Sequence, residues 1–460
     1  MVPSAPADPA VTGGSLAERV LVSCPELKTA KALCVGYSGG LDSTVLLHLM
    51  TQLRRSGLVA GELRALHVHH GLQPVADEWA RQCQLQCAQW QVPLTVRRVQ
   101  VDHAAGAGPE AAARNARYQA FAVELQTDEV LLLAHQQDDQ AETLLLRLLR
   151  GSGADGLAGM PDRRALAAGR LLRPLLAIGR DELHRHAMMH ALQWIDDPTN
   201  VDARYDRNFL RTQLMPSLQR RWPAAAASLA RSAELLQETG SLQDELAQLD
   251  LVACDAGFSN RLSVAALRLL NAVRQRNLLR FWFGRQPPEL AAVPNWAVLH
   301  RCVDELLTPA AVDHAMLQWG QGDEARELHR YRDSLYLLNP LPAELPAELV
   351  WPSSSQTLQL PAPLGVMQWS DRANVDWPLT VRFRRGGERI VKPDGHHQGF
   401  KDFCQQRGIP PWLRHAIPML YHGDELLAIG DEPVPSTALS RQAENRPQLR
   451  WLRSHLLCGW

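Results

Sequence analysis

Short apolar runs alternate with amphipathic stretches through the first 135 residues of this 460-residue chain. The runs have the length and composition of strands that are buried on both faces, and they span 32–37, 63–69, 94–101 and 129–135. The stretches between them carry apolar residues at helical spacing, most clearly at 77–90 and 109–126. Such alternation predicts βαβ units, and therefore a parallel sheet with helices on both faces and ligands at the carboxyl ends of its strands.

The pattern changes in the second half of the chain. Residues 171–176 we interpret as a helix, and 209–251 is rich in alanine and leucine at helical spacing; the sequence up to 339 stays mostly helical. Prolines and serines then crowd together, which is typical of a spacer, before β-like alternation returns at 379–383. These changes divide the chain into a tail and entry segment at 1–30, an α/β domain at 31–222, a helical domain at 223–339, a linker at 340–378 and a small α+β domain at 379–460.

The first strand runs directly into S-G-G-L-D-S at 38–43, and an amphipathic helix follows. Gly39 and Gly40 allow a tight turn and a close approach of the backbone to a ligand, and the free N–H groups of the helix start suit an anion. Asp42 would repel a phosphate, but it is a good ligand for a Mg²⁺ ion that bridges phosphates. The simpler alternative is a glycine turn that serine and aspartate merely cap.

The second strand ends in H-V-H-H-G-L at 67–72. Three histidines suggest zinc, but in a strand His67 and His69 share one face while His70 points away. No carboxylate or thiol follows at ligand spacing. We therefore expect a strand-end loop that packs near the nucleotide.

Two further motifs follow strands. A helix start at 109–118 carries Arg114 and Arg117, which could bind a phosphate or simply face solvent. In A-H-Q-Q-D-D-Q-A-E-T at 134–143, Asp138 and Glu142 lie four residues apart on one helix face, and His135 precedes that helix. Such carboxylates can bind Mg²⁺, accept a proton from an attacking amine, or only complement the helix dipole. Because these carboxylates crowd together with a histidine at a strand end, we favour a role in Mg²⁺ binding or proton transfer over complementation of the helix dipole alone.

Composition excludes a few classes of protein. A hydrophobic content of 46% and a charged content of 21% are ordinary for a globular protein. The net charge of -1 argues against unspecific polyanion binding, but not against an RNA docked on a local basic face. The eight cysteines form no C-x-x-C, so we expect free thiols in the core or on the surface, not cysteines that bind a metal. No signal sequence and no apolar run of membrane-spanning length is present, so we expect a cytoplasmic protein with reduced thiols.

Taken in order, the motifs resemble those of the tRNA(Ile)-lysidine synthetases, a family of PP-loop ATP pyrophosphatases. The strings are SGGLDS, HVHHGL, AARNARYQAF, AHQQDDQAET, RGSGADGLAGM, RPLL, WIDDPTN and YDRNFLR. The first is shared by the whole PP-loop class, and the ordered set selects this family. The resemblance covers about 31–222 and returns near the C-terminus, as in the long forms that carry a C-terminal domain.

This resemblance implies a domain of the adenine nucleotide alpha hydrolase type that uses ATP and Mg²⁺. It implies ligation of L-lysine to C2 of the wobble cytidine of tRNA(Ile) with a CAU anticodon, through an adenylated cytidine, which changes the codon read from AUG to AUA. The implied ATP-binding residues are Ser38, Gly39, Gly40, Leu41, Asp42, Ser43 and Arg114. The implied catalytic residues are Asp42, His135, Asp138 and Glu142, with Asp42 and Asp138 as Mg²⁺ ligands. The implied tRNA contacts are Arg207, Asn208, Arg211, Arg384 and Arg385.

The chain departs from the family pattern in two places. Gln136 stands where many relatives carry a second histidine, and 396–402 is less basic than the corresponding run. Two other functions compete with lysidine synthesis. One is tRNA 2-thiolation, against which the lack of C-x-x-C argues; the other is nucleotide-regulated RNA binding without chemistry, which the intact S-G-G-L-D-S opposes. We also allow for a homodimer.

Overall fold

The structure is a computed structural model of the chain. It describes residues 14–71, 75–100, 109–197, 202, 204–288, 290–308, 315–352, 355–369, 378–391, 396–434 and 449–453. The predicted tail therefore lies largely outside the described residues, as does the end of the W-I-D-D-P-T-N motif. The chain forms two compact units, Met1–Ser241 and Leu242–Trp460, and each is described by itself.

The first unit is built on a six-stranded sheet in the order β3-β2-β1-β4-β6-β5. The strands are β1 (Ala32–Gly36), β2 (Glu62–His69), β3 (Leu94–Arg98), β4 (Val130–Leu132), β5 (Arg163–Leu166) and β6 (Gly169–Leu172). All neighbours pair in parallel except β5 and β6, which form an antiparallel hairpin at one edge. The predicted parallel sheet is confirmed.

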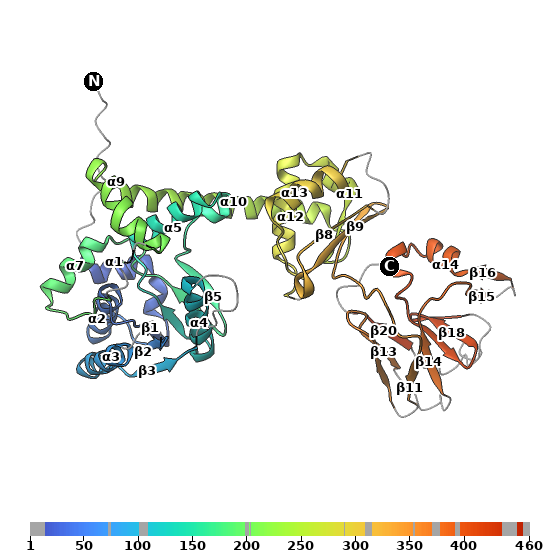
Figure 1. Cartoon of the computed structure of the whole chain (residues 1–460), viewed down its shortest axis with the longest axis horizontal. Coiled ribbons are helices and arrows are strands. Elements are labelled where there is room, and N and C mark those ends of the chain that lie inside the picture. Colours follow the sequence, from blue (N-terminus) through green and yellow to red (C-terminus); the bar gives the residue numbers. More distant parts are fainter. Residues whose placement is uncertain are drawn as a thin grey trace, which may run out of the picture. The chain divides into compact units, whose positions relative to one another are not determined.

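Helices cover both faces of this sheet (Figure 1). The long ones are α1 (Leu16–Ser23), α2 (Leu41–Arg55), α3 (Ala76–Trp90), α4 (Pro109–Glu124), α5 (Gln137–Leu149) and α7 (Arg180–Met189). Alternation along β1 shows how both faces are filled: Leu33 and Val35 pack with the core beneath α1, α2 and α7, while Cys34 packs with Phe121 of α4 on the other face. Both faces of β1 are thus apolar, which explains its uninterrupted hydrophobic run.

The predicted helix at 171–176 is wrong. Leu171 and Leu172 complete β6, and a turn follows at 174–177. Pro174 explains the difference, because a proline disfavours the helical region for the residue before it and offers no N–H to a helix. The two leucines therefore pair with β4 instead.

Short helical pieces complete the first unit. They are α6 (Ala154–Leu157), α8 (Asp206–Phe209), a π-helical turn (Leu210–Leu214) and α9 (Met215–Arg221). The long helix α10 (Ala225–Cys254) begins in this unit and ends in the second. None of the described helices is both long and apolar enough to cross a lipid bilayer.

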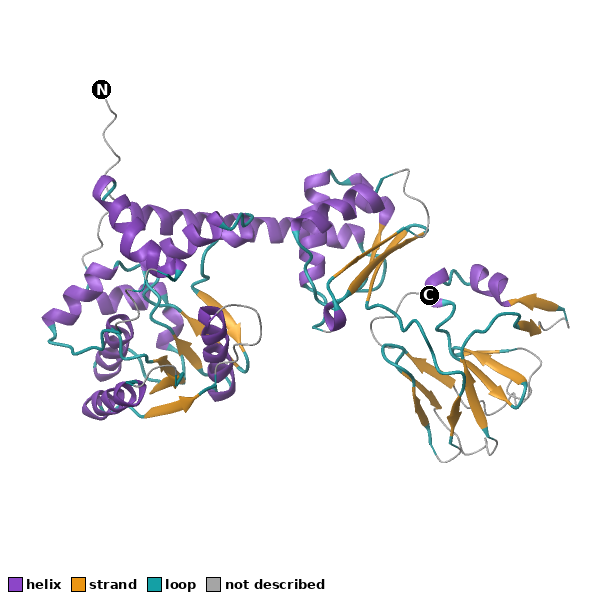
Figure 2. Cartoon of the chain, in the orientation of Figure 1, coloured by secondary structure: helices purple, strands orange, loops and turns teal. Residues whose placement is uncertain are grey.

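The second unit begins with a mixed domain. Helices α11 (Val264–Leu269), α12 (Ala272–Gly284) and α13 (Trp296–Arg301) pack on an antiparallel sheet ordered β7-β10-β9-β8. Its strands are β7 (Arg261–Ser263), β8 (Met316–Trp319), β9 (Arg326–Tyr331) and β10 (Ser334–Leu338). Trp282 and Phe283 lie at the centre of its core. The helices agree with the sequence pattern, whereas the sheet was not predicted (Figure 2).

The end of the chain forms antiparallel sheets ordered β11-β14-β17-β18-β19 and β12-β13-β20, with a β15–β16 hairpin. The strands are β11 (Leu349–Trp351), β12 (Thr357–Gln359), β13 (Val366–Trp369), β14 (Leu379–Arg382), β15 (Arg389–Val391), β16 (His397–Gly399), β17 (Met419–His422), β18 (Glu425–Ile429), β19 (Glu432–Pro433) and β20 (Leu449–Leu452). Helix α14 (Phe400–Gln406) follows the β15–β16 hairpin.

The predicted spacer at 340–378 is wrong for its described part. It supplies β11, β12 and β13, and two of its tryptophans, Trp351 and Trp369, are fully buried in the core of the C-terminal sheets. The prolines and serines lie between these strands, at their ends. The proline and serine content therefore predicted the turns correctly, but it did not predict the short strands between them, whose apolar positions alternate.

Candidate active site

The S-G-G-L-D-S loop joins β1 to α2 at the carboxyl edge of the sheet. Gly39 has a φ of +85°, and a Cβ at that position would lie 2.6 Å from Ile195 Cδ1 and 2.8 Å from Cys83 Sγ. Glycine is therefore required by both backbone and space. Gly40 occupies the N-cap of α2 and has no side chain to cap it, so the first N–H groups of the helix remain available to an anion.

The two serines of the loop hold its shape. Ser38 Oγ lies 3.0 Å from Ser43 Oγ and accepts a hydrogen bond from the Gly40 N–H. Ser43 Oγ also donates to the Gly40 carbonyl at 3.0 Å. The sequence predicted these hydroxyls as phosphate contacts, and in the structure they also brace the turn that presents the helix N-terminus.

Asp42 is the charged residue of the loop. Its Oδ1 is buried and has no hydrogen-bond partner among the described residues. Burial, together with the neighbouring Asp139 and Asp138 carboxylates, raises the pKa of Asp42 to about 6 against the opposing charges of Arg180 and Arg211. An unpaired carboxylate oxygen crowded by other acids fits a divalent cation, which would satisfy the oxygen and relieve the repulsion.

The second acidic motif starts α5 beside this loop. Gln136 is fully buried, and its side chain caps the helix by accepting a hydrogen bond from the Asp138 N–H at 2.6 Å. Asp139 completes the cap by accepting from the Gln136 N–H at 3.0 Å. Asp138 Oδ2 accepts from the Arg180 N–H at the start of α7. The N-terminus of α5 thus brings two acidic side chains, Asp138 and Asp139, toward Asp42.

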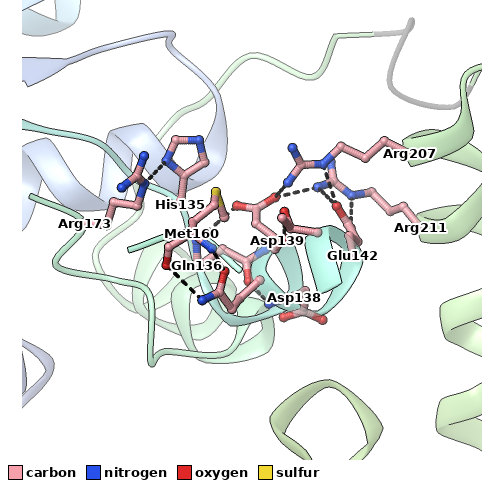
Figure 3. A network of polar contacts seen from close by, with 11 residues as sticks. His135, Gln136, Asp138, Asp139, Glu142, Met160, Arg173, Arg207 and Arg211 are labelled. Atoms are coloured by element: carbon pink, nitrogen blue, oxygen red, sulfur yellow. Dashed lines mark hydrogen bonds and ion pairs between the residues drawn. The ribbon is translucent and has the colours of Figure 1, made fainter. Parts of the chain in front are cut away.

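Two of the acids are held in a buried ion-pair network (Figure 3). Arg207 reaches Glu142 Oε2 at 2.8 Å and Asp139 Oδ1 at 2.9 Å. Arg211 reaches Glu142 Oε1 and Asp139 Oδ1, each at 2.8 Å. We call these four residues the acid–arginine quartet. Figure 3 shows Asp138 turned away from it.

The quartet changes the interpretation of three predicted residues. Arg207 and Arg211 were expected to contact tRNA, yet their guanidinium groups are used inside the protein. Glu142 is almost wholly buried between them, so its carboxylate is neutralised. Asn208, also expected at the tRNA, donates its side-chain amide to the Asp202 carbonyl at 3.1 Å.

His135 lies on the other side of α5 from the quartet. Its Nδ1 accepts a hydrogen bond from Arg173 Nε at 3.3 Å. Burial lowers the pKa of His135 to about 3; Asp139 opposes this effect, and the nearby arginines add to it. The ring is therefore neutral at pH 7, with Nδ1 as acceptor and Nε2 carrying the proton.

A positive group gathers around His135. Arg173 Nη2 lies 3.3 Å from Tyr118 Oη, and the exposed Arg114 stacks 5.4 Å above the Tyr118 ring. Arg117 has no ion-pair partner among the described residues, and burial lowers the pKa of its guanidinium. A half-buried guanidinium with no ion-pair partner among the described residues suits a phosphate, so Arg117 is better placed for one than the predicted Arg114.

Sequence analysis missed two residues of this site. Arg173 lies in the quoted R-P-L-L string without an assigned role, and only the sheet brings it to His135. Arg180 was not considered, because it belongs to no motif and acts through its backbone N–H. Both are supplied by segments beyond α5, where spacing along the chain carries no signal.

The H-V-H-H-G-L histidines are held by the fold. His67 Nδ1 lies 2.9 Å from the Tyr37 carbonyl, just before the S-G-G-L-D-S loop, and His69 Nε2 lies 3.2 Å from Asp77 Oδ1. Within the described ranges, no group of three or more His, Cys, Asp and Glu side chains forms a metal cage. Mg²⁺ does not need one, since it is commonly bound by one or two carboxylates and the phosphates of its substrate.

Arg384 and Arg385 belong to the second unit. Arg384 lies 3.8 Å from Glu388 and stacks 5.4 Å from the Phe400 ring. The Arg385 side chain is exposed, and its N–H donates to Glu388 Oε1 at 2.6 Å. Both arginines thus flank a loop that Glu388 ties together.

Three family models match successive parts of the chain. One described as a PP-loop domain matches 15–218, one described as a TilS substrate binding domain matches 262–336, and one described as a TilS substrate C-terminal domain matches 379–451. The first covers the sheet and both acidic motifs.

Curated relatives match nearly the full length. The tRNA(Ile)-lysidine synthases of Xanthomonas axonopodis pv. citri and Pseudomonas aeruginosa are each 43% identical, over 91% of this chain and 93% of the relative. That of Escherichia coli O157:H7 is 39% identical over 93% of this chain and 98% of the relative. Together with the three matching domains, these identities show that the chain belongs to the tRNA(Ile)-lysidine synthase family.

Proposed function

We propose that this protein ligates L-lysine to C2 of the wobble cytidine in the CAU anticodon of tRNA(Ile). The observation that carries the proposal is the meeting of the ordered family motifs at one sheet edge, around the unpaired Asp42 Oδ1. The product, lysidine, would make the tRNA read AUA instead of AUG. Both substrates, ATP and tRNA, are cytoplasmic, so we assign the reaction to the cytoplasm.

The first step is adenylation of the base. The C2 oxygen of cytidine attacks the α-phosphorus of ATP, an O–P bond forms, and the bond to the β-phosphate breaks to release pyrophosphate. The N-terminus of α2 and the half-buried Arg117 would bind the phosphates. Asp42, with Asp138 beside it, would hold the Mg²⁺ ion, which neutralises phosphate charge when it is bound.

The second step replaces AMP by lysine. The side-chain amine attacks C2, the C2–O bond breaks, and AMP leaves with its electrons. Of the acids near Asp42, Asp138 is the one outside the quartet, so it is the best candidate to accept the proton that the amine loses. His135, neutral at pH 7, would position a substrate oxygen through Nε2–H instead of donating a proton as an acid.

Single-turnover assays with labelled lysine and labelled ATP test the proposal. We expect AMP and pyrophosphate release that needs the tRNA(Ile) transcript, and lysine transfer to it. A transcript with uridine at the wobble position is the matched control and should accept no lysine. Transfer of sulfur without a lysine requirement would identify a thiolase, and tRNA binding without pyrophosphate release would identify a non-catalytic RNA-binding protein.

A further inference from the structure

A hollow at the outer edge of the parallel sheet lies apart from all the candidate catalytic residues. It has a volume of about 650 Å³. Its lining is Asp77, Ala80, Arg81, Gln84, Val96, Arg97 and Arg98, from α3 and the edge strand β3, which lie side by side in Figure 1. The Arg81 and Arg98 side chains face one carboxylate there, whereas the Arg97 side chain lies on the other face of β3, where it pairs with Glu124 of α4. The volume is in the range of pockets that accept a nucleotide-sized group.

The hollow opens at the functional edge of the sheet. Because β1, β2 and β3 are parallel, Arg97 and Arg98 at the end of β3 lie at the same edge as the S-G-G-L-D-S loop after β1. Two strand spacings separate β3 from β1, which is about 10 Å. A nucleotide strand with one base at Asp42 would therefore have neighbouring phosphates within reach of the hollow.

The two arginines of the hollow are held in place by exposed acids. Arg98 pairs with Asp77, and Arg81 Nε lies 3.0 Å from Glu78 Oε2. The side chains of both arginines are 66–68% exposed. Exposed ion pairs of this kind are weak, so a phosphate that offers several acceptor oxygens can replace the carboxylates.

The histidine motif connects this hollow to the nucleotide loop. His67 contacts the Tyr37 carbonyl before the loop, while His69, on the same face of β2, contacts Asp77 in the hollow. On α3, Cys83 packs directly under Gly39, and Arg81 and Gln84 point into the hollow. Strand β2 and helix α3 thus fix both places relative to each other.

We propose that this hollow binds backbone phosphates of the RNA strand whose base enters the active site. The inference rests on the proposed function, and it assigns the substrate's flanking phosphates to Arg81 and Arg98. Its recognition chemistry is guanidinium–phosphate pairing without base reading, so the site would contribute affinity and salt dependence, not sequence choice.

The test measures tRNA(Ile) transcript binding against salt for the parent chain and the double variant Arg81→Ala/Arg98→Ala. We expect affinity to fall about 10-fold at low salt and the slope of log K against log salt to fall by about 2, with ATP binding unchanged. Arg54→Ala is the matched control, since Arg54 is exposed in the last turn of α2, at the opposite edge of the sheet. It should behave as the parent.

A second variant separates binding from folding. Asp77→Asn removes the one carboxylate of the hollow, so tRNA affinity should rise, whereas a purely structural Asp77 would give unchanged or weaker binding. Parental affinity and slope in the double variant, or loss of its ATP binding, would overturn the inference. Failure of the parent chain to bind the transcript at all would instead overturn the proposed function.

Discussion

At the scale of single residues, Asp42 combines a functional position with an unfavourable environment. Its folded pKa of about 6 lies above the ordinary value of 3.8. Because folding raises the pKa of this carboxyl, its contribution to stability is most favourable below about pH 4, where the group is protonated in both the folded and the unfolded state. The free energy of unfolding then falls as the pH rises from about 4 through about 6. At pH 7 the charged Asp42 should destabilise the first unit by about 1–3 kcal/mol when no cation is bound.

We therefore predict opposite effects of Asp42→Asn on stability and on activity. The variant should unfold at a higher temperature than the parent at pH 7 without Mg²⁺, and it should form AMP at least 100-fold more slowly. The stability difference should vanish at pH 4. Thermal unfolding at both pH values and single-turnover adenylation measure this; a folded variant that adenylates at the parental rate would reduce Asp42 to a helix cap.

His135 and Gln136 are neighbours with different roles. Removing the ring in His135→Ala should slow adenylation, because Arg173 loses its acceptor and the substrate its Nε2–H donor. Gln136→His should be tolerated, since an imidazole nitrogen can still accept from the Asp138 N–H. Single-turnover rates decide the ranking, and the reverse order would show that the role belongs to Gln136.

His135 also makes a prediction for the pH profile. Since its pKa is about 3, the ring should not titrate between pH 5 and 8. Any rise in rate near pH 6 should then persist in His135→Gln, which keeps a polar side chain, and should be absent in Asp42→Asn. Loss of that rise in His135→Gln would mean that the histidine changes its charge during the reaction.

At the scale of elements, the quartet fixes α8 and the following π-helical turn against α5. Breaking a buried ion pair from one side leaves an uncompensated charge, which typically costs about 3–5 kcal/mol. Arg211→Met should therefore lower the free energy of unfolding of the first unit by that order. Arg204→Met is the matched control, because Arg204 is exposed and pairs only with the nearby Asp202. Equal denaturation midpoints for both variants would return Arg211 to the role of a tRNA contact.

The same scale shows what the sequence could predict. The strands β1 to β4 and the helices α2 to α5 follow from continuous apolar runs and helical spacing, and the residues around Asp42 follow from motifs at strand ends. Arg117 and Arg173 gain their importance only from burial and from pairing across elements, which no local spacing reports. The prediction of a spacer at 340–378 failed for the same reason. Trp351 and Trp369 are far apart in the sequence, and only the assembled sheets show that they share one core.

At the scale of the whole molecule, the chemistry is assigned to the first unit, and RNA binding is assigned to both units. The C-terminal strands begin at Leu349, inside the segment once expected to be a spacer. A cut in that segment would remove core strands and would not test RNA binding cleanly. Point substitutions in the full chain are therefore the sharper experiment, and Arg385, whose exposed side chain lies beside the loop tied by Glu388, is the natural target.

We predict that Arg384→Ala/Arg385→Ala weakens tRNA binding while the chemistry at saturating tRNA is unchanged. Each lost phosphate contact should lower the slope of log K against log salt by about 1. Arg407→Ala is the control, since Arg407 is a half-exposed arginine of the same domain that is engaged by Glu432. Affinity measured across salt concentrations and lysine transfer at saturating tRNA separate the two roles. Equal slopes and affinities would mean that the C-terminal sheets serve folding or assembly, whereas a slower transfer at saturation would mean that this loop of the second unit helps to place the anticodon.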